Sequence, residues 1–137
     1  MIVLATEQDT IYLAQHFAEK PATLLSKKLA ESEILVAKSE TEHFGYLSWG
    51  YLWDKLPFMY ELWLEEPFRR QGIGRLLVTE WEHIMKAKGY TLVLTSTQAD
   101  EQGQHFYRAI DYRDAGVMLL PDEPSELILL KHLNENV

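Results

Sequence analysis

The sequence contains no cysteine. This absence excludes disulfides, a cysteine nucleophile and zinc bound by thiolates. The chain also has no run approaching the ~20 apolar residues that a membrane-spanning helix needs. Its first residues, "MIVLATEQDT", lack the basic segment and the long apolar segment of a secretory signal. We therefore expect a cytoplasmic protein that does not act at a membrane.

Positive charge is scarce as well. The chain has 13 Lys and Arg against 21 Asp and Glu, which gives a formal net charge of -8 at pH 7. A nucleic-acid-binding protein needs a basic surface to neutralise phosphates, so we expect no nucleic-acid partner. An acidic surface attracts cations, including protonated amines, although the same charge also serves solubility alone.

What the chain does contain is typical of a folded domain. Its 137 residues are 47% hydrophobic and 25% charged, and no internal repeat, linker or low-complexity segment interrupts them. This length and composition are those of one globular domain with its own core. We expect a single domain over residues 1–137.

Hydrophobic periodicity in the first half predicts one strand, two helices and then three strands. Thr6 is placed to cap the first helix, and Pro21 opens the second, in which Leu24, Leu25 and Leu29 face inward. The predicted elements cover residues 1–6, 7–18, 22–32, 33–40, 43–53 and 58–64. In the first helix the expected inward face consists of Ile11, Leu13, Ala14, Phe17 and Ala18.

The second half alternates between helices and strands. A helix over residues 73–88 ends at Gly89, a residue type favoured just after a helix. Its expected inward residues are Ile73, Leu76, Leu77, Trp81, Ile84 and Met85. A strand over 90–96, a helix over 100–110 and strands over 116–120 and 126–133 follow. The order β-α-α-β-β-β-α-β-α-β-β suits a mixed α/β (α+β) sheet with helices on both faces.

The segment "FRRQGIG", Phe68 to Gly74, places two arginines and two glycines at the start of the 73–88 helix. The first N–H groups of a helix have no intrahelical partner, and its dipole favours an anion there. Glycines let a phosphate approach the backbone, and arginines add charged donors. The pattern predicts a phosphate or pyrophosphate site at residues 69–75. A Gly-rich turn with two solvated arginines is the alternative.

Two other phosphate-binding motifs fit this segment poorly. A P-loop is excluded because Gly74 is followed by Arg75 rather than by Lys and Ser or Thr. A dinucleotide-binding loop lacks its third glycine, since Leu77 stands at that position.

Histidines and aromatic residues give weaker signals. Glu80 and His83 form half of a carboxylate-bridged metal motif, but no second half exists in the chain, so we expect a solvated helix face and no metal. The aromatic-rich segment 44–53 is most simply a core strand, although it also allows a substrate pocket or the surface of a homodimer.

Two motifs together resemble the GCN5-related N-acetyltransferase (GNAT) superfamily. Arg69-x-x-Gly72-x-Gly74, within "LWLEEPFRRQGIGRLL", is similar to the acetyl-CoA signature of that family. The later segment "QHFYRAIDY" looks like its late tyrosine-bearing helix, except that Asp111 stands where relatives commonly have Gly. The resemblance implies a mixed, mostly antiparallel sheet of about seven strands, with helices on both faces and a splayed parallel central pair.

The resemblance also implies a function. A GNAT enzyme would transfer an acetyl group from acetyl-CoA to a primary amine of a small molecule or peptide by direct attack, without a metal. A non-catalytic acyl-CoA-binding or regulatory module of the same fold is the alternative. The residues that the resemblance implies in donor binding are Leu62, Trp63, Leu64, Arg69, Arg70, Gln71, Gly72, Ile73, Gly74, Arg75, Asp100 and Tyr107.

Among these residues, Tyr107 is the implied catalytic acid, which protonates the departing thiolate. Glu61 is the candidate base, because it precedes Leu62 on a strand and points to the opposite face from it. A water chain to another carboxylate is the competing candidate. Gly103, which the pattern places inside the late helix, serves either close approach of the donor or tight packing on a neighbouring element.

Overall fold

The computed structural model describes residues 1–133. Its elements are β1 (Ile2–Leu4), η1 (Glu7–Asp9), α1 (Thr10–His16), α2 (Leu24–Ala30), β2 (Ile34–Lys38), β3 (His43–Leu52), β4 (Leu56–Leu64), η2 (Glu66–Phe68), α3 (Ile73–Ala87), β5 (Leu92–Gln98), α4 (Gly103–Ala109), β6 (Arg113–Met118) and β7 (Glu126–His132). The predicted order of helices and strands is confirmed, with most elements one to three residues shorter at their ends than expected.

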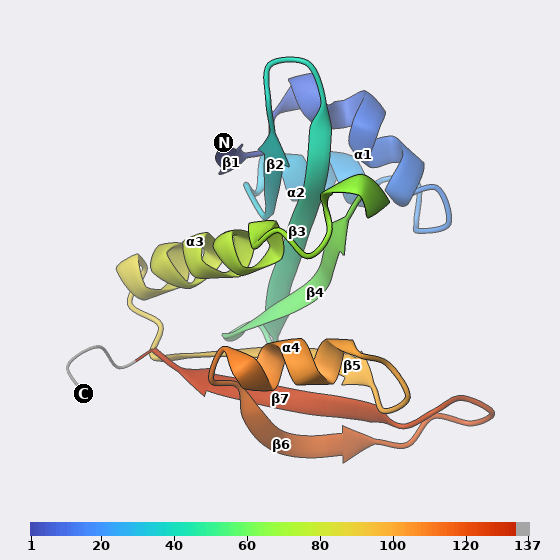
Figure 1. Cartoon of the computed structure of the whole chain (residues 1–137), viewed down its shortest axis with the longest axis vertical. Helices are drawn as coiled ribbons and strands as arrows, with labels where there is room; N and C mark the ends of the chain where they lie inside the picture. Colours follow the sequence, from blue (N-terminus) through green and yellow to red (C-terminus); the bar gives the residue numbers. More distant parts are fainter. Residues whose placement is uncertain (134–137) are drawn as a thin grey trace. The chain divides into compact units, whose positions relative to one another are not determined.

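Within the described residues, seven strands form one sheet in the order β1-β2-β3-β4-β5-β7-β6 (Figure 1). The pair β4 and β5 is parallel, with Phe58 opposite Leu94 and Met59 opposite Thr95. Antiparallel ladders join β1 to β2, β2 to β3, β5 to β7 and β6 to β7. The predicted mixed, mostly antiparallel α/β fold is therefore confirmed.

Contacts divide the chain into two compact units. The first unit comprises Met1–Trp49 and Glu61–Trp81, and the second comprises Gly50–Tyr60 and the chain from Glu82 onward. The division passes through β3, β4 and α3, so each of these elements contributes to both units. The expectation of a single domain over residues 1–137 stays a prediction.

The first unit begins with a capping box. The Thr6 N–H donates to Asp9 Oδ2 at 2.9 Å, and the Thr6 hydroxyl accepts from the Gln8 N–H at 3.3 Å. Thr6 thus acts as the predicted cap, but the turn that it starts is the 3-10 helix η1, and α1 begins only at Thr10.

That 3-10 turn shifts the phase of α1. Leu13 and Phe17 are buried as predicted, but Ile11 is 82% exposed and Ala14 and Ala18 are exposed too. The expected inward face was therefore partly wrong. A 3-10 turn has 3.0 residues per turn rather than 3.6, so a helical pattern counted from residue 7 does not continue into α1.

The core of the first unit lies between α1, α2 and the strands β2 and β3. Ala5, Leu13, Phe17, Ile34, Val36 and Tyr46 form its buried cluster. Leu24, Leu25 and Leu29 of α2 pack against this cluster, as predicted, and α1 and α2 lie side by side in Figure 1. Tyr46 and Trp49 of β3 are buried, so the core interpretation of the aromatic segment holds for these two residues.

Helix α3 contributes its buried stripe to both units. Leu77, Val78, Trp81 and Met85 are buried, whereas Leu76 is 58% exposed, contrary to the prediction. The buried residues recur at i, i+4 and i+8 from Leu77, and Leu76 lies about 100° away from that line. No helix within residues 1–133 has the length and apolar character needed to cross a membrane.

The end of α3, in the second unit, confirms the role predicted for Gly89. Gly89 has a φ of 98° and its N–H donates to Lys86 O at 2.9 Å, while the Tyr90 N–H donates to Met85 O at 3.1 Å. These two bonds form a Schellman motif, which favours glycine because the left-handed conformation crowds a Cβ atom.

Gly103 was expected inside the late helix, but it is the first residue of α4. A Cβ atom added at Gly103 would lie 3.0 Å from the Thr97 hydroxyl of β5. Of the two roles considered for this glycine, tight packing on a neighbouring element therefore has direct structural support.

The end of α4 repeats the Schellman geometry without a glycine. The Tyr112 N–H donates to Tyr107 O at 3.0 Å and the Asp111 N–H to Arg108 O at 3.2 Å, while Asp111 has a φ of 78°. An L-residue with a side chain adopts this conformation at an energetic cost.

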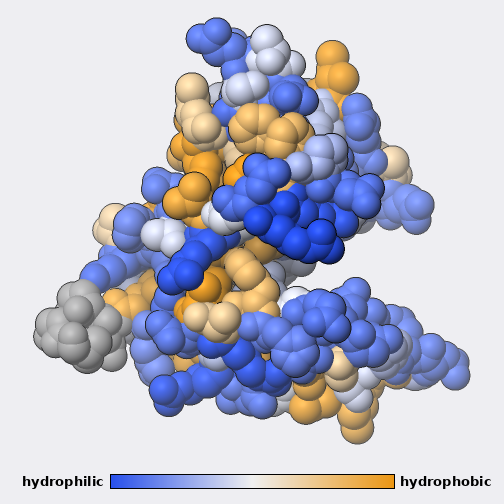
Figure 2. Space-filling view, viewed as in Figure 1, coloured by the Kyte–Doolittle hydropathy of each residue, from blue (hydrophilic) through white to orange (hydrophobic). Residues whose placement is uncertain are grey.

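Strand β6 follows and forms one edge of the sheet. All its residues are exposed, and Val117, Met118 and Leu119 add apolar surface there, which Figure 2 shows as hydrophobic patches along this edge. The strand begins three residues before the predicted start at Gly116, because Arg113 and Asp114 already pair with β7.

Candidate functional site

The chain leaves β4 at Leu64 and reaches α3 through η2 and a short loop. In this loop Arg70 has a φ of 60° and Gly72 a φ of 86°. The Leu76 N–H donates to Gly72 O at 3.1 Å, which is the first helical bond of α3. The N–H groups of Ile73, Gly74 and Arg75 therefore have no acceptor within the helix.

The outer side of this loop is open. A Cβ atom added at Gly72 would meet no heavy atom within 4 Å, although its positive φ would still strain a larger residue. The side chains of Arg70 and Arg75 are exposed beside it. Unpaired N–H groups, the positive pole of a 15-residue helix and two arginines make this loop suited to an anion.

Arg69 and Gln71 brace the same loop. Arg69 Nε donates to Leu64 O at 2.8 Å, and its guanidinium carbon lies 4.7 Å from the centre of the Trp63 ring. Gln71 Nε2 donates to Pro67 O at 2.9 Å. These contacts give both side chains a local role in holding the loop, next to the roles that the motif implies.

Just before η2, Glu65 collects three donors on one oxygen. Its Oε2 accepts from the Tyr12 hydroxyl at 2.7 Å, from His16 Nε2 at 3.0 Å and from Trp63 Nε1 at 3.0 Å. Burial alone would raise the pKa of Glu65, but the bonds from Tyr12 and Trp63 and the charge of His16 lower it below its ordinary value. We call Tyr12, His16, Trp63 and Glu65 the Glu65 network.

A second carboxylate, Asp9, extends this arrangement. Its Oδ1 lies 2.7 Å from Lys38 Nζ and 2.7 Å from His43 Nε2, and the His43 ring stacks on Tyr12 at 4.3 Å. Burial raises the pKa of Asp9, but hydrogen bonds from Lys38, Thr6 and His43 outweigh it, so that the pKa is lowered. Neither carboxylate centre was predicted from the sequence. The i, i+4 spacing of Tyr12 and His16 was the one local sign of them.

Glu61 lies on the same face of β4 as Trp63, as strand alternation predicts, but its environment differs from that of Glu65. Its side chain is 34% exposed, and its Oε1 lies 3.7 Å from Lys20 Nζ. Within residues 1–133 this Oε1 is buried without a hydrogen-bond partner, and so is the Tyr46 hydroxyl. Burial, together with the nearby Glu61 carboxylate, raises the pKa of Tyr46, which therefore stays protonated.

The second unit contains the other predicted residues. Tyr107 is only 7% exposed and packs edge-on against Phe106 and Tyr112, at ring distances of 5.1 and 5.6 Å. Burial raises the pKa of Tyr107 to about 12, against a smaller lowering by Thr95. Tyr107 is thus a protonated donor at neutral pH. Asp100 is exposed in the turn between β5 and α4.

The structure therefore brings the predicted residues together in two groups. Glu61–Leu64 and Arg69–Arg75 belong to the first unit, whereas Asp100 and Tyr107 belong to the second. Among residues 1–133, no cluster of three or more histidine, aspartate or glutamate side chains is arranged to hold a metal ion.

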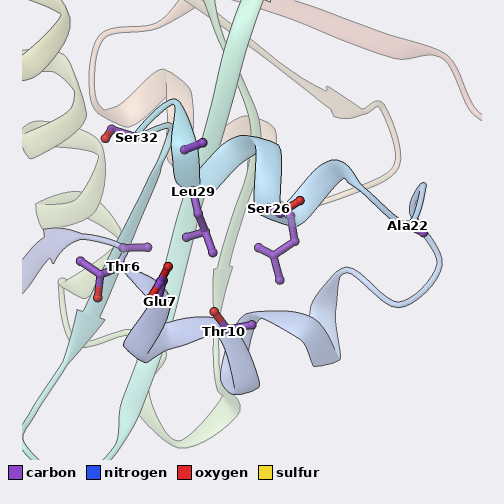
Figure 3. Close-up of a pocket in the computed structure, with 10 residues that line it drawn as sticks. Thr6, Glu7, Thr10, Ala22, Ser26, Leu29 and Ser32 are labelled. Atoms are coloured by element: carbon purple, nitrogen blue, oxygen red, sulfur yellow. The ribbon is translucent and has the colours of Figure 1, made fainter.

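A cavity of about 820 Å³ lies elsewhere in the first unit, between the η1–α1 segment and α2 (Figure 3). In Figure 3 the Leu29 side chain points from α2 toward η1 across it. It is lined by Ala5, Thr6, Glu7, Thr10, Ala22, Leu25, Ser26, Leu29, Ala30 and Ser32. None of these is a predicted site residue, and none carries the positive charge that a phosphate site needs.

Comparisons with known proteins identify the family and the fold. Protein YyaT of Bacillus subtilis (strain 168) is 28% identical over 72 residues, which are 53% of this chain and 47% of that protein, so the match spans about half the length of each. The structure is similar to that of Ard1 from Thermoplasma volcanium, with a TM-score of 0.82 and 13% identity over 98% of both chains.

A GNAT family acetyltransferase from Elizabethkingia anophelis, solved with acetyl-CoA bound, has a TM-score of 0.75 and 19% identity. The alignment covers 96% of this chain and 97% of that one. Likeness at this identity shows the fold. The model of the acetyltransferase (GNAT) family matches residues 4–112, which is most of the sequence and includes both predicted motifs. The chain therefore belongs to the GNAT family of acetyltransferases.

Proposed function

We propose that this protein is an acetyl-CoA-dependent N-acetyltransferase that acetylates a primary amine of a small molecule or peptide. The observation that carries the proposal is the open loop at Arg70 and Gly72, which leads into the unpaired N–H groups of α3. Family membership and the acetyl-CoA bound to the Elizabethkingia anophelis relative support the same donor.

The residues of the first unit fit the donor chemically. The pyrophosphate would accept from the N–H groups of residues 71–75, and Arg70 and Arg75 would supply charge beside it. The backbone of Leu62–Leu64 would pair with the amide groups of the pantetheine arm as a neighbouring strand does. In this proposal Arg69 acts mainly through the loop, because its Nε is already bonded to Leu64 O.

The reaction needs a neutral amine, because an ammonium has no lone pair with which to attack the thioester carbonyl. Glu61 would take the proton, since its buried Oε1 lies 3.7 Å from the Lys20 ammonium and has no hydrogen bond among the described residues. The Leu64 N–H would polarise the carbonyl oxygen. Tyr107, which is protonated at neutral pH, would give its proton to the departing thiolate.

Three further expectations belong to this proposal. The acceptor amine approaches the face of β4 that holds Glu61, the protein acts in the cytoplasm, and two copies can associate. Asp100 contributes near the pantetheine arm from the turn after β5.

Donor binding is tested by the melting temperature with and without acetyl-CoA, with NAD as the control ligand. At 100 times its dissociation constant a ligand adds about 2.7 kcal/mol, which is a shift of several degrees. We expect Arg75→Glu to reduce this shift, and Arg113→Glu, the same charge change on the exposed strand β6, to leave it intact. An absence of any shift in the wild-type protein would contradict the proposal.

Catalysis is tested by thiol release from acetyl-CoA over a panel of amines. The chain has no cysteine, so the protein itself contributes no thiol signal. A melting shift without thiol release for any amine would leave an acyl-CoA-binding module and contradict the transferase function.

A further inference from the structure

Lys20 lies between α1 and α2 and approaches the candidate base directly. Its Nζ is 3.7 Å from Glu61 Oε1 and 5.6 Å from the centre of the Phe17 ring. The Lys20 N–H donates to Phe17 O at 3.1 Å, which fixes the start of its side chain. Its side chain is 37% exposed, so solvent and ligands reach the ammonium.

Other lysines of the chain hold their carboxylates more tightly. Lys28 Nζ lies 2.9 Å from Glu33, Lys38 Nζ 2.7 Å from Asp9 and Lys131 Nζ 3.0 Å from Glu82. Each of these pairs is a charge-assisted hydrogen bond, in which the proton is shared with a carboxylate that stabilises the ammonium. The distance of 3.7 Å at Lys20 exceeds hydrogen-bond range, so its ammonium is attracted to Glu61 but not fixed there.

One oxygen of the carboxylate that Lys20 faces lacks a hydrogen bond among the described residues, and the Tyr46 hydroxyl lies close to the same carboxylate. Glu61 Oε1 is buried and accepts no hydrogen bond within residues 1–133. A buried acceptor without a partner costs free energy. A nitrogen donor that lay about 1 Å nearer to Glu61 Oε1 than Lys20 Nζ does would be within hydrogen-bond range. The position of the Lys20 ammonium is thus the position that an acceptor amine requires beside its base.

We propose that Lys20 is itself an acceptor, so that the protein acetylates its own Lys20 side chain. This inference rests on the proposed function, because it uses the same donor and the same base. The Lys20 ammonium gives one proton to Glu61, and the lone pair of the neutral nitrogen attacks the carbonyl carbon of the acetyl thioester. The new C–N bond forms as the C–S bond breaks, the nitrogen loses its second proton, and the thiolate takes up a proton. The products are N-acetyl-Lys20 and free CoA thiol.

The modification changes the site that produces it. An acetylated Lys20 carries no charge, so Glu61 no longer faces an internal ammonium. An external amine then meets the carboxylate without an internal competitor. Self-acetylation of this kind is limited to one event per chain, which distinguishes it from turnover.

The experiment incubates the purified protein with acetyl-CoA carrying a ¹³C-labelled acetyl group and measures the label at every lysine by peptide mass spectrometry. The exposed residues Lys27 and Lys55 report the background of uncatalysed acetylation. Because a positioned base accelerates proton transfer by ~10²–10⁴-fold, we expect label at Lys20 to appear at least about tenfold faster than at these two. The Lys20 rate constant should not change when the protein is diluted tenfold.

Glu61→Gln is the matched variant. It should lower the rate at Lys20 to that of Lys27 and Lys55 without changing the rate at those two residues. Its melting temperature with and without acetyl-CoA, measured on the same sample, shows whether it folds and binds the donor. A Glu61→Gln protein that binds acetyl-CoA and still labels Lys20 faster than background would overturn the proposal.

The failure of this inference is distinguishable from the failure of the proposed function. If acetyl-CoA raises the melting temperature and an external amine releases thiol, but Lys20 gains label no faster than Lys27, the self-acetylation proposal is wrong and the transferase function stands. If acetyl-CoA causes no shift and no lysine exceeds background, both are wrong.

Discussion

Glu61 and Glu65 are four residues apart and lie on the same face of the first unit, but they differ in how many hydrogen bonds their carboxylates accept. Glu65 accepts from three donors on one oxygen, and its pKa is lowered. Glu61 has a buried oxygen that no donor within residues 1–133 reaches. A carboxylate whose acceptors are filled holds a structure together, whereas one with an open oxygen is available to take a proton from a ligand.

The second unit contains a similar pair of tyrosines. The Tyr112 hydroxyl donates to Glu82 Oε2 at 2.8 Å, and Lys131 Nζ donates to the other oxygen of Glu82 at 3.0 Å. Burial raises the pKa of both tyrosines, but Thr95 opposes this effect at Tyr107, whereas the charge and the hydrogen bond of Glu82 add to it at Tyr112, so the pKa of Tyr107 is raised less. In both units, therefore, a residue with a structural hydrogen-bond role, Glu65 or Tyr112, lies close in sequence to a residue with a proposed catalytic role, Glu61 or Tyr107.

The largest effect is expected from Glu61→Gln, which tests whether Glu61 is the catalytic base. General acid–base catalysis contributes ~10²–10⁴-fold, so we expect turnover of an amine at neutral pH to fall by at least about 100-fold. The melting shift with acetyl-CoA should persist, because Glu61 does not belong to the loop that we propose as the donor site. Glu66→Gln, at an exposed residue of η2, is the control and should keep normal turnover.

The next largest effect is expected from Tyr107→Phe. Loss of the proton donor should reduce turnover by roughly 10- to 100-fold. Because burial raises the pKa of Tyr107 to about 12, this tyrosine stays protonated as the pH rises, and the rate of the wild-type enzyme should not decline up to about pH 10. A wild-type rate that declines between pH 8 and about 10 would contradict this assignment.

Glu65→Ala tests the structural side of the comparison. It leaves the partly buried Tyr12 hydroxyl and His16 Nε2 and the exposed Trp63 Nε1 without their acceptor. An unsatisfied donor costs about 1–3 kcal/mol where water does not reach it. We expect chemical denaturation to show a loss of stability in that range. Turnover per folded molecule, measured well below the melting temperature, should change less than it does in Glu61→Gln. The reverse order of effects would refute the comparison.

Stability should fall at low pH because of two hydrogen-bonded carboxylates, Asp9 and Glu65. Asp9 and Glu65 both have a lower pKa in the folded protein than their ordinary values of 3.8 and 4.5. Their stabilisation is therefore complete well above pH 4.5 and is lost as the pH falls through those values toward the folded ones. In urea titrations, Asp9→Asn should be less stable than the wild type at pH 7 and should lose less stability on acidification.

The smallest expected effect lies far from both glutamates in the sequence. Asp111 has a φ of 78° at the end of α4, where glycine is favoured. Asp111→Gly should raise the stability by about 1 kcal/mol, because it removes the cost of a left-handed L-residue. Thermal unfolding measures the gain, and a loss of stability would show that the Asp111 side chain supports this turn.

Local patterns in the sequence predicted the elements and their order correctly. Thr6 and Gly89 have their predicted roles because a cap depends on residues within a few positions of it. The exposure of Ile11 and Leu76 was not predicted, because the phase of a buried stripe depends on where the helix begins and on what it packs against. Gly103 was misplaced because α4 begins three residues later than the pattern suggested.

The candidate site was predictable only where its residues are close in sequence. The loop before α3 was recognisable because its glycines and arginines are contiguous. Tyr12 and Glu65 are 53 positions apart, and Asp9 and His43 are 34 apart, so only the folded chain brings these partners together. The approach of Lys20 to Glu61 has the same origin and no signature in the sequence.

The stacking of Arg69 on Trp63 gives the protein an optical reporter of its own. The indole is partly exposed, donates to Glu65 and carries a guanidinium 4.7 Å from its ring, so its emission responds to the charge and water around the donor loop. Trp49 and Trp81 are buried and lie 6.4 Å from each other, which makes them a steady background for that signal, and the 75% exposed Trp53 adds its own emission. Ligand binding at the loop can therefore be followed by intrinsic fluorescence in stopped flow without an attached dye.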